Sequence, residues 1–247
     1  MNLLLLRAED FLPDGTARLR GRRAVHAKEV LRAQAKDVLR VGLWGGQVGT
    51  AEVLSIGGGE VHLRPTLDTA PPDRAHIDLL LAIPRPKALK KVLPAVASLG
   101  VDRLVLVNAA RVEKSYFDSK VLAPAFIEEL LALGLEQARD TVPPKVFVRE
   151  RFRPFVEDEL AGVFGDVAHR WLAHPVGEKP LPALPRPGPT ERILLAIGPE
   201  GGWVPFEVQL LEAQGFRTFS LGPRILRVET AVPLLVGQAA LYRQLSA

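Results

Sequence analysis

The chain has 247 residues, which is enough for one large domain or for a small domain followed by a larger one. Hydrophobic residues make up 47% and charged residues 24%, a composition typical of soluble globular proteins, and no apolar run approaches membrane-spanning length. The formal net charge is +4, and the absence of cysteine excludes disulfides, thiolate nucleophiles and cysteine metal sites.

The first residues give no sign of a targeting segment. Four successive leucines follow Asn2, without a basic leader or a cleavage site, so we expect no signal peptide. Together with the absence of cysteine, this favours a cytoplasmic protein.

The first 70 residues have the pattern of a small β-barrel. Residues 26–31 predict a short helix, and three alternating runs follow at 38–44, 47–56 and 60–65. Glycine turns separate these runs, and alternation with a period of two indicates antiparallel strands. Residues 69–73 read as a linker. We therefore expect an N-terminal domain over residues 1–70 and a second domain over residues 71–247.

The second domain alternates between apolar strands and helices. Such alternation predicts a mainly parallel α/β sheet that is covered on both faces. We expect strands at 77–83, 101–107, 145–148, 171–174, 193–197 and 216–221, and helices at 87–99, 122–139, 155–162, 205–215 and 230–245.

Two glycine-proline turns each follow a predicted strand. Gly198-Pro-Glu-Gly-Gly202 follows strand 193–197, and Gly222-Pro223 follows strand 216–221. Gly198, Gly201 and Gly202 can adopt positive φ and leave room for a ligand, although an ordinary tight turn has the same pattern. Neither a Walker loop nor G-x-G-x-x-G is present, which points away from ATP and NAD. We expect the two strands to be neighbours, so that both turns line one cleft at their carboxyl ends.

Basic residues cluster in two places. Eight basic residues stand against two acids between residues 16 and 40, and residues 85–91 hold four more without any acid. Such patches suit a polyphosphate such as RNA, and a solvated basic face is the alternative. We assign RNA contacts to Arg18, Arg20, Arg22, Arg23, Lys28, Arg32, Arg85, Lys87, Lys90 and Arg139.

The two turns together resemble a family signature. Residues 198–202 and Leu221-Gly-Pro-Arg-Ile-Leu-Arg-Val-Glu-Thr-Ala231 are similar to those of the ribosomal small-subunit RNA uridine-N3 methyltransferases, the RsmE group of the SPOUT superfamily. Residues 85–100 resemble the basic helix of that family, residues 135–139 its Glu-x-x-Gln-x-x-Arg-type segment, and the basic barrel its PUA-like RNA-binding domain. The chain departs from the family at Val228, and Pro233 interrupts the first turns of the last predicted helix.

The resemblance implies a trefoil knot in the C-terminal domain, a rare arrangement, and S-adenosylmethionine as cofactor. It also implies a homodimer, with ribosomal RNA or the small ribosomal subunit as the other partner. The last helix would supply the dimer contact, although its pattern equally fits an internal core helix. The implied cofactor contacts are His174, Pro175, Ile197, Gly198, Pro199, Gly201, Gly202, Leu221, Gly222, Ile225, Leu226 and Thr230.

The residues agree with methylation at N3. Attack through C5 of uridine usually needs a cysteine, whereas N3 needs one base and good alignment. Glu229 is the first candidate base and Glu200 the second, while Arg227 would stabilise the developing negative charge. Charge compensation at a helix N-terminus is the alternative for Glu229. The five histidines lack metal-binding spacing, so we expect no metal.

The expected function is therefore S-adenosylmethionine-dependent methylation of N3 of a uridine in small-subunit (16S) ribosomal RNA. Two alternatives stay open from the sequence. The enzyme would modify another RNA position, such as a ribose 2′-oxygen, or the chain would be a non-catalytic RNA-binding factor in ribosome assembly.

Overall fold

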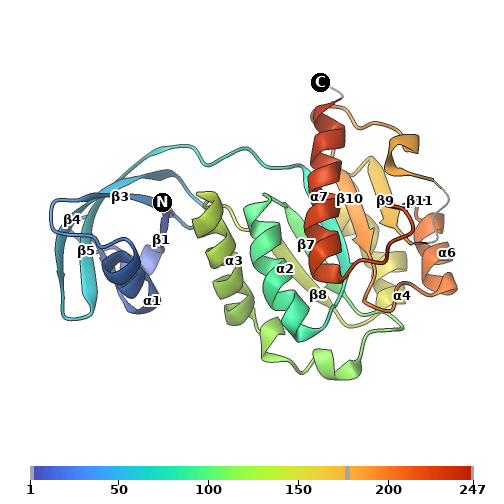
Figure 1. Ribbon diagram of the computed structural model, residues 1–247, viewed down its shortest axis with the longest axis horizontal. Helices are drawn as coiled ribbons and strands as arrows, with labels where there is room; N and C mark the ends of the chain where they lie inside the picture. Colours follow the sequence, from blue (N-terminus) through green and yellow to red (C-terminus); the bar gives the residue numbers. More distant parts are fainter. Residues whose placement is uncertain (1–2, 176–178, 246–247) are drawn as a thin grey trace. The chain divides into compact units, whose positions relative to one another are not determined.

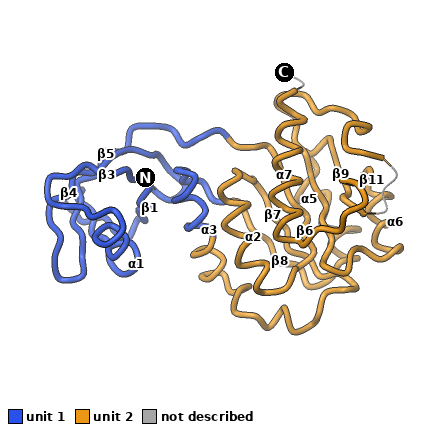
Figure 2. Tube along the Cα trace, viewed as in Figure 1, with its two compact units in different colours: residues 1–73, 131–143 blue, residues 74–130, 144–247 orange. Residues whose placement is uncertain are grey.

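The computed structural model describes residues 3–175 and 179–245 (Figure 1). Contacts divide the chain into two compact units (Figure 2). The first contains residues up to 73 together with residues 131–143, and the second contains residues 74–130 and 144–247. The expected boundary near residue 70 thus leaves out a later segment, 131–143, that groups with the first unit.

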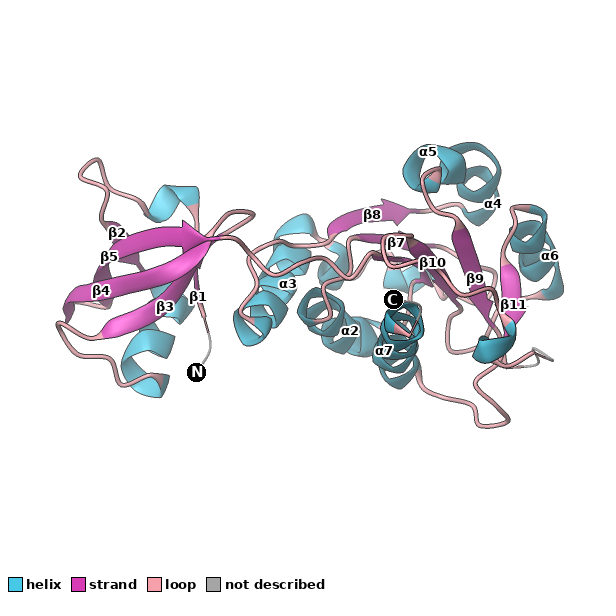
Figure 3. Ribbon diagram, turned by 90° about the horizontal axis from the view of Figure 1, so that it is seen from above, coloured by secondary structure: helices cyan, strands magenta, loops and turns pink. Residues whose placement is uncertain are grey.

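The first unit is built on a curled five-stranded sheet in the order β1-β3-β4-β5-β2 (Figure 3). The three predicted strands are confirmed as antiparallel neighbours, and β1 adds a parallel pair with β3. The expectation was an antiparallel barrel. The sheet is instead a half-barrel, because its edge strands β1 and β2 do not pair with each other, and it is mixed, because β1 pairs with β3 in parallel. Its strands are β1 (Leu4–Leu6), β2 (Ala17–Leu19), β3 (Val38–Leu43), β4 (Val48–Gly57) and β5 (Glu60–Thr69).

Helical turns cover this sheet, and alternate strand residues form its core. The turns are η1 (Ala8–Asp10), α1 (Gly21–Val25) and η2 (His26–Val30), so the expected helix begins five residues before residue 26. The core contains fully buried side chains such as Leu6, Leu19, Val41, Val53 and Leu63. Their alternation along β3, β4 and β5 is the period-two pattern that the sequence displays.

The second unit contains a six-stranded sheet in the order β11-β9-β10-β6-β7-β8. Every strand pair is parallel, which confirms the predicted sheet type. The central strands β6 and β10 are buried at every position, as their mostly apolar sequences require, and Asp78 in β6 is their one polar residue. The strands are β6 (Ile77–Ala82), β7 (Arg103–Val107), β8 (Lys145–Arg149), β9 (His169–Ala173), β10 (Ile193–Ile197) and β11 (Arg217–Phe219).

Helices cover both faces of this sheet. Figure 3 shows α2 and α7 on one face and α4, α5 and α6 on the other. The final helix is continuous through Pro233, contrary to the expected interruption, although this proline lies inside the helix and cannot donate a backbone hydrogen bond. The helical elements are α2 (Pro86–Ser98), η3 (Lys114–Tyr116), η4 (Lys120–Leu122), α3 (Pro124–Ala138), α4 (Phe152–Pro154), η5 (Phe155–Glu159), α5 (Leu160–Phe164), η6 (Leu181–Ala183), α6 (Pro205–Ala213) and α7 (Val228–Gln244).

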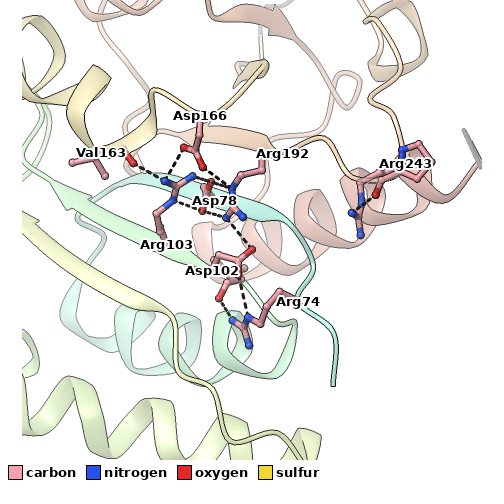
Figure 4. A network of polar contacts seen from close by, with 10 residues as sticks. Arg74, Asp78, Asp102, Arg103, Val163, Asp166, Arg192 and Arg243 are labelled. Atoms are coloured by element: carbon pink, nitrogen blue, oxygen red, sulfur yellow. Dashed lines mark hydrogen bonds and ion pairs between the residues drawn. The ribbon is translucent and has the colours of Figure 1, made fainter. Parts of the chain in front are cut away.

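An ionic network lies at the amino ends of the central strands (Figure 4). Asp78, fully buried in β6, accepts hydrogen bonds from Arg103 at 2.9 and 2.6 Å and from Arg192 at 3.1 and 2.9 Å. Asp102 and Asp166 supply further carboxylates to these two arginines. The network fastens β6, β7 and β10 at the edge opposite their carboxyl ends. Within the described ranges, no helix is long and apolar enough to cross a membrane.

Candidate functional site

An open pocket lies at the carboxyl ends of β9, β10 and β11. It has about 690 Å³ of empty space, part of which is open to solvent. The three segments that follow these strands form its walls, and the first turns of α7 complete it. Its lining residues are Ala173, His174, Pro175, Ile197, Gly198, Pro199, Glu200, Gly202, Trp203, Phe219, Leu221, Gly222, Arg224, Ile225, Leu226, Val228, Ala231 and Leu235.

The strand order corrects one expectation. The two strands that carry the glycine turns, β10 and β11, are not neighbours, because β9 lies between them. The chain crosses from β10 over β9 before it forms β11, and local sequence patterns do not predict this strand order. The pocket therefore has a third wall, His174 and Pro175, supplied by the end of β9.

Glycine occupies positions 198, 201 and 202 of the first turn for a different structural reason at each position. Only Gly202 has the expected positive φ, 73°, among Gly198, Gly201 and Gly202. A Cβ at Gly198 would lie 3.2 Å from the Trp203 ring and backbone nitrogen, and one at Gly201 would lie 2.9 Å from Cδ of Arg111. The expectation of positive φ at the other two is wrong, since close neighbours explain those glycines. We call residues 198–204 the glycine loop.

Two carboxylates hold the glycine loop in place. Glu207, 2% exposed, accepts hydrogen bonds from the backbone N–H groups of Val204 at 2.9 Å and Ala110 at 2.7 Å. Glu200 accepts one from the backbone N–H of Arg85 at 3.0 Å. The loop is thus tied to the segments that follow β6 and β7. Glu207 was missed from the sequence, because a carboxylate two residues into a predicted helix has no distinctive pattern.

The second turn is held by Ser220 and Gly222. The hydroxyl of Ser220 accepts a hydrogen bond from the backbone N–H of Gly222 at 3.1 Å and contacts the carbonyl oxygen of Pro175 at 3.2 Å. Gly222 has a φ of 102°, a conformation that disfavours any residue with a side chain. Ser220 therefore joins two of the walls of the pocket, a role that its sequence position does not show.

Most of the predicted cofactor residues come together in this pocket. Ten of the twelve line it, and the exceptions are Gly201 and Thr230. Apolar residues of β9, β11 and α7 also contribute, and the sequence reasoning missed them. Their spacing on α7, Val228, Ala231 and Leu235, was readable as one helical face, but a core helix gives the same pattern.

Of the three predicted catalytic residues, Glu200 lines the pocket, and Arg227 and Glu229 do not. Arg227 is the N-cap residue of α7 and is exposed. Glu229 lies 3.6 Å from the ammonium nitrogen of Lys91. A hydrogen bond from its own backbone N–H, together with the charge of Lys91, lowers the pKa of Glu229. It is therefore a carboxylate at neutral pH, beside rather than within the pocket.

Comparison with known proteins places this geometry in a family. Residues 71–240 match the RNA methyltransferase domain family. The ribosomal RNA small subunit methyltransferase E of Treponema pallidum is 32% identical over 235 residues, which cover 94% of this chain and 87% of that protein. The chain belongs to the family of RsmE-type ribosomal RNA methyltransferases. The Synechocystis enzyme of the same name is 26% identical over 95% of this chain and 76% of its own length.

Solved methyltransferase structures share the fold. The ribosomal RNA small subunit methyltransferase E from Neisseria gonorrhoeae, bound to S-adenosylmethionine, matches with a TM-score of 0.75 at 22% identity and covers 96% of both chains. A Legionella pneumophila structure that also contains S-adenosylmethionine has a TM-score of 0.76 at 22% identity and covers 97% of this chain and 96% of that one. The mixed α/β architecture is thus that of RNA methyltransferases.

Several predicted RNA contacts of this methyltransferase have carboxylate partners in the first unit. Both terminal nitrogens of Arg22 bind Glu136, at 2.9 and 3.0 Å, and those of Arg23 bind Asp10. Arg20 binds Glu60 at 2.6 Å, and Arg18 lies 3.5 Å from the same carboxylate. Lys28 and Arg32 are exposed and have no acidic partner among the residues that the structure describes.

The remaining candidates are Arg139 and the basic residues near α2. Arg85, Lys87 and Lys90 are exposed, and the ammonium group of Lys90 lies 5.3 Å from the ring centre of Phe126. Arg139 has a positive φ of 59° directly after α3. No group of three or more potential metal-ligating side chains occurs in residues 3–175 and 179–245.

Proposed function

We propose that this methyltransferase transfers a methyl group from S-adenosylmethionine to N3 of a uridine in small-subunit (16S) ribosomal RNA. The observation that carries the proposal is the three-walled pocket at the carboxyl ends of β9, β10 and β11, in a chain of the RsmE-type family. Such an edge of a parallel sheet is where α/β proteins bind small ligands.

The lining of the pocket suits S-adenosylmethionine in its chemistry. Small-molecule sites are mostly apolar with a few placed polar groups, and this lining has that composition. Apolar side chains such as Leu226 and Leu235 offer surfaces for an adenine ring, and the turns at Gly198 and Gly222 bring backbone polar groups to the wall. Bound there, the cofactor would supply an electrophilic methyl group on a positively charged sulfur. The trefoil knot belongs to this proposal, with the glycine loop and residues 220–227 as its pocket-facing segments.

Two candidate bases and one candidate cation carry the proposed chemistry. N3 of uridine must lose its proton before or during methylation, so a nearby carboxylate is required. Glu229 stays the first candidate and Glu200 the second, although Glu200 already accepts a hydrogen bond from Arg85. Arg227, exposed beside Glu229 in sequence, would stabilise the negative charge that develops on the uracil oxygens.

The first unit is proposed to be the PUA-like RNA-binding domain, and the second the SPOUT-type catalytic domain. The homodimer is proposed to form through α7. Leu234 and Leu241 of α7 are exposed and lie seven residues apart, and the exposed C-cap residue Leu245 follows four residues later, so the three share one stripe. Ile225, which lines the pocket and is 82% exposed, adds further apolar surface. The cytoplasmic location is part of the proposal, because ribosomal RNA is the substrate.

The first test uses small ribosomal subunits from a strain that lacks the gene. Incubation with methyl-labelled cofactor and this chain should label the RNA, and nucleoside mass spectrometry should detect N3-methyluridine. A 2′-O-methylated nucleoside instead would support the alternative RNA position and reject N3. Absence of any label would leave the chain without the proposed activity.

The second test addresses the catalytic residues. Glu229→Gln and Arg227→Ala should each keep cofactor affinity and reduce turnover at least about tenfold, the lower part of the range for acid–base catalysis. Glu200→Gln is the comparison. Full turnover in both of the first two variants would reject their roles, and a loss confined to Glu200→Gln would move the base to that position.

A further inference from the structure

Arg111 contacts the glycine loop from outside the pocket. Its guanidinium donates a hydrogen bond to the carbonyl oxygen of Gly201. Its aliphatic part lies on the same glycine, since a Cβ at Gly201 would come within 2.9 Å of Cδ of Arg111. Arg111 belongs to the segment that follows β7 and does not line the pocket.

The backbone beneath Arg111 is fixed to the same loop. Glu207 accepts the N–H of Ala110 with one carboxylate oxygen and the N–H of Val204 with the other. Because Glu207 is buried, water does not compete freely for these bonds. The segment that carries Arg111 and the glycine loop are thus held together at two points.

The charge of Arg111 is not neutralised by a carboxylate. Several other arginines of the second unit bind acids: Arg103, Arg149, Arg153 and Arg192. Arg111 is exposed and has only the Gly201 carbonyl as a polar partner within the described part of the chain. A guanidinium has five N–H donors, so most of them face solvent. An anion that binds here is chemically favoured, and a phosphate matches the planar donor group.

We propose that Arg111 is a positioning residue that couples RNA binding to cofactor binding. One part of its guanidinium holds Gly201, and the rest binds a phosphate of the RNA substrate. A phosphate that fixes the guanidinium also fixes the glycine loop, so RNA and cofactor each raise the affinity of the other by the same factor. The inference rests on the proposed cofactor pocket, and it does not depend on which RNA atom receives the methyl group.

The test measures binding rather than turnover. S-adenosylhomocysteine, which cannot donate a methyl group, is titrated by calorimetry with and without small-subunit ribosomal RNA. We expect the RNA to raise its affinity at least about fivefold in the unchanged protein, the lower end of ordinary coupling. Arg111→Ala should reduce that factor to about one and lower cofactor affinity without RNA about three- to tenfold, as loss of one hydrogen bond predicts.

Two further variants separate the contacts. Arg111→Gln keeps a donor for Gly201 but loses the charge, so cofactor affinity without RNA should stay within about twofold of the wild-type value. The slope of RNA affinity against salt concentration should fall by the contribution of about one phosphate contact. Arg153→Ala is the matched control, because Arg153 is exposed and pairs with Glu157 at 2.9 Å. It should keep the coupling factor and the salt dependence.

The proposal would be overturned if Arg111→Ala kept the coupling factor or the salt dependence of the wild-type protein. It would also be overturned if RNA did not change the cofactor affinity of the wild-type protein. The pocket itself is tested separately by Ala231→Trp, which fills it from α7. If that variant binds S-adenosylhomocysteine normally, the proposed pocket is rejected whatever Arg111 does. Thermal melting confirms that each variant is folded.

Discussion

The carboxylate of Glu229 lies 3.6 Å from the ammonium nitrogen of Lys91 and joins α7 to α2 beside the pocket. A hydrogen bond from its own backbone N–H and the charge of Lys91 hold the pKa of Glu229 below its usual range. A lowered folded-state pKa stabilises the protein above the unfolded-state value, and this contribution is lost as the pH falls through the folded-state value.

Lys91→Met should therefore raise the pKa of Glu229 and move the midpoint of acid unfolding to higher pH. Carbon-13 NMR titration of the glutamate carboxyl groups measures the first effect, and circular dichroism during acid titration measures the second. Lys87→Met is the control, because Lys87 is exposed on the same helix without an acidic partner among the described residues. Identical Glu229 titration in both variants would contradict the assigned cause.

Asp78 is the centre of the ionic network at the amino edge of the parallel sheet (Figure 4). Asp78→Asn removes the buried carboxylate that Arg103 and Arg192 share, and the side chains of these arginines are only 17% and 20% exposed. We expect a loss of about 3–5 kcal/mol in the free energy of unfolding, as for other broken buried ion pairs. Urea denaturation measures the loss.

Asp166→Asn provides the comparison for that experiment. Asp166 contacts the same two arginines but its side chain is 56% exposed, so the loss should stay below about 1 kcal/mol. Equal losses in the two variants would show that burial of Asp78 is not what makes its contacts important.

The strands and the glycine turns are predictable because their signals are local. Mostly apolar runs predict β6 and β10, and the alternation along β4 and β5 indicates one buried face. Short strands such as β1 and β2, with three residues each, have no pattern long enough to read. Most of the predicted cofactor residues are accordingly in the pocket, since they follow strands that the sequence reveals.

Contacts between distant residues are what the sequence could not predict. The bond between Arg22 and Glu136 joins positions 114 residues apart, and that between Glu207 and Ala110 joins positions 97 apart. A count of basic residues therefore counts arginines that are already neutralised within the fold. Likewise, a glycine motif does not say whether a ligand or Arg111 occupies the space beside Gly201.

Basic residues of the first unit differ in whether a carboxylate partner binds them, and we expect the two groups to have different roles. Lys28→Ala with Arg32→Ala should reduce the salt dependence of RNA binding by about two phosphates and leave stability within about 0.5 kcal/mol. Arg23→Ala removes hydrogen bonds to Asp10, which is 7% exposed, and should cost about 2–3 kcal/mol of stability. Filter binding at several salt concentrations and urea denaturation separate these effects. A larger change of salt dependence in Arg23→Ala than in the double variant would reverse the assignment.

The last prediction concerns Gly202, a pocket-lining residue whose backbone has a positive φ of 73°. A Cβ at this position would meet nothing within 4 Å, so substitution there tests backbone conformation without a steric clash. Gly202→Ala should cost about 1–2 kcal/mol, the usual difference for a non-glycine residue in the left-handed region. Gly202→Asn should cost less, because asparagine tolerates that region better. Urea denaturation measures both, and calorimetry with S-adenosylhomocysteine should rank the variants in the same order. Equal stability of all three proteins would mean that the loop adopts another backbone conformation without penalty.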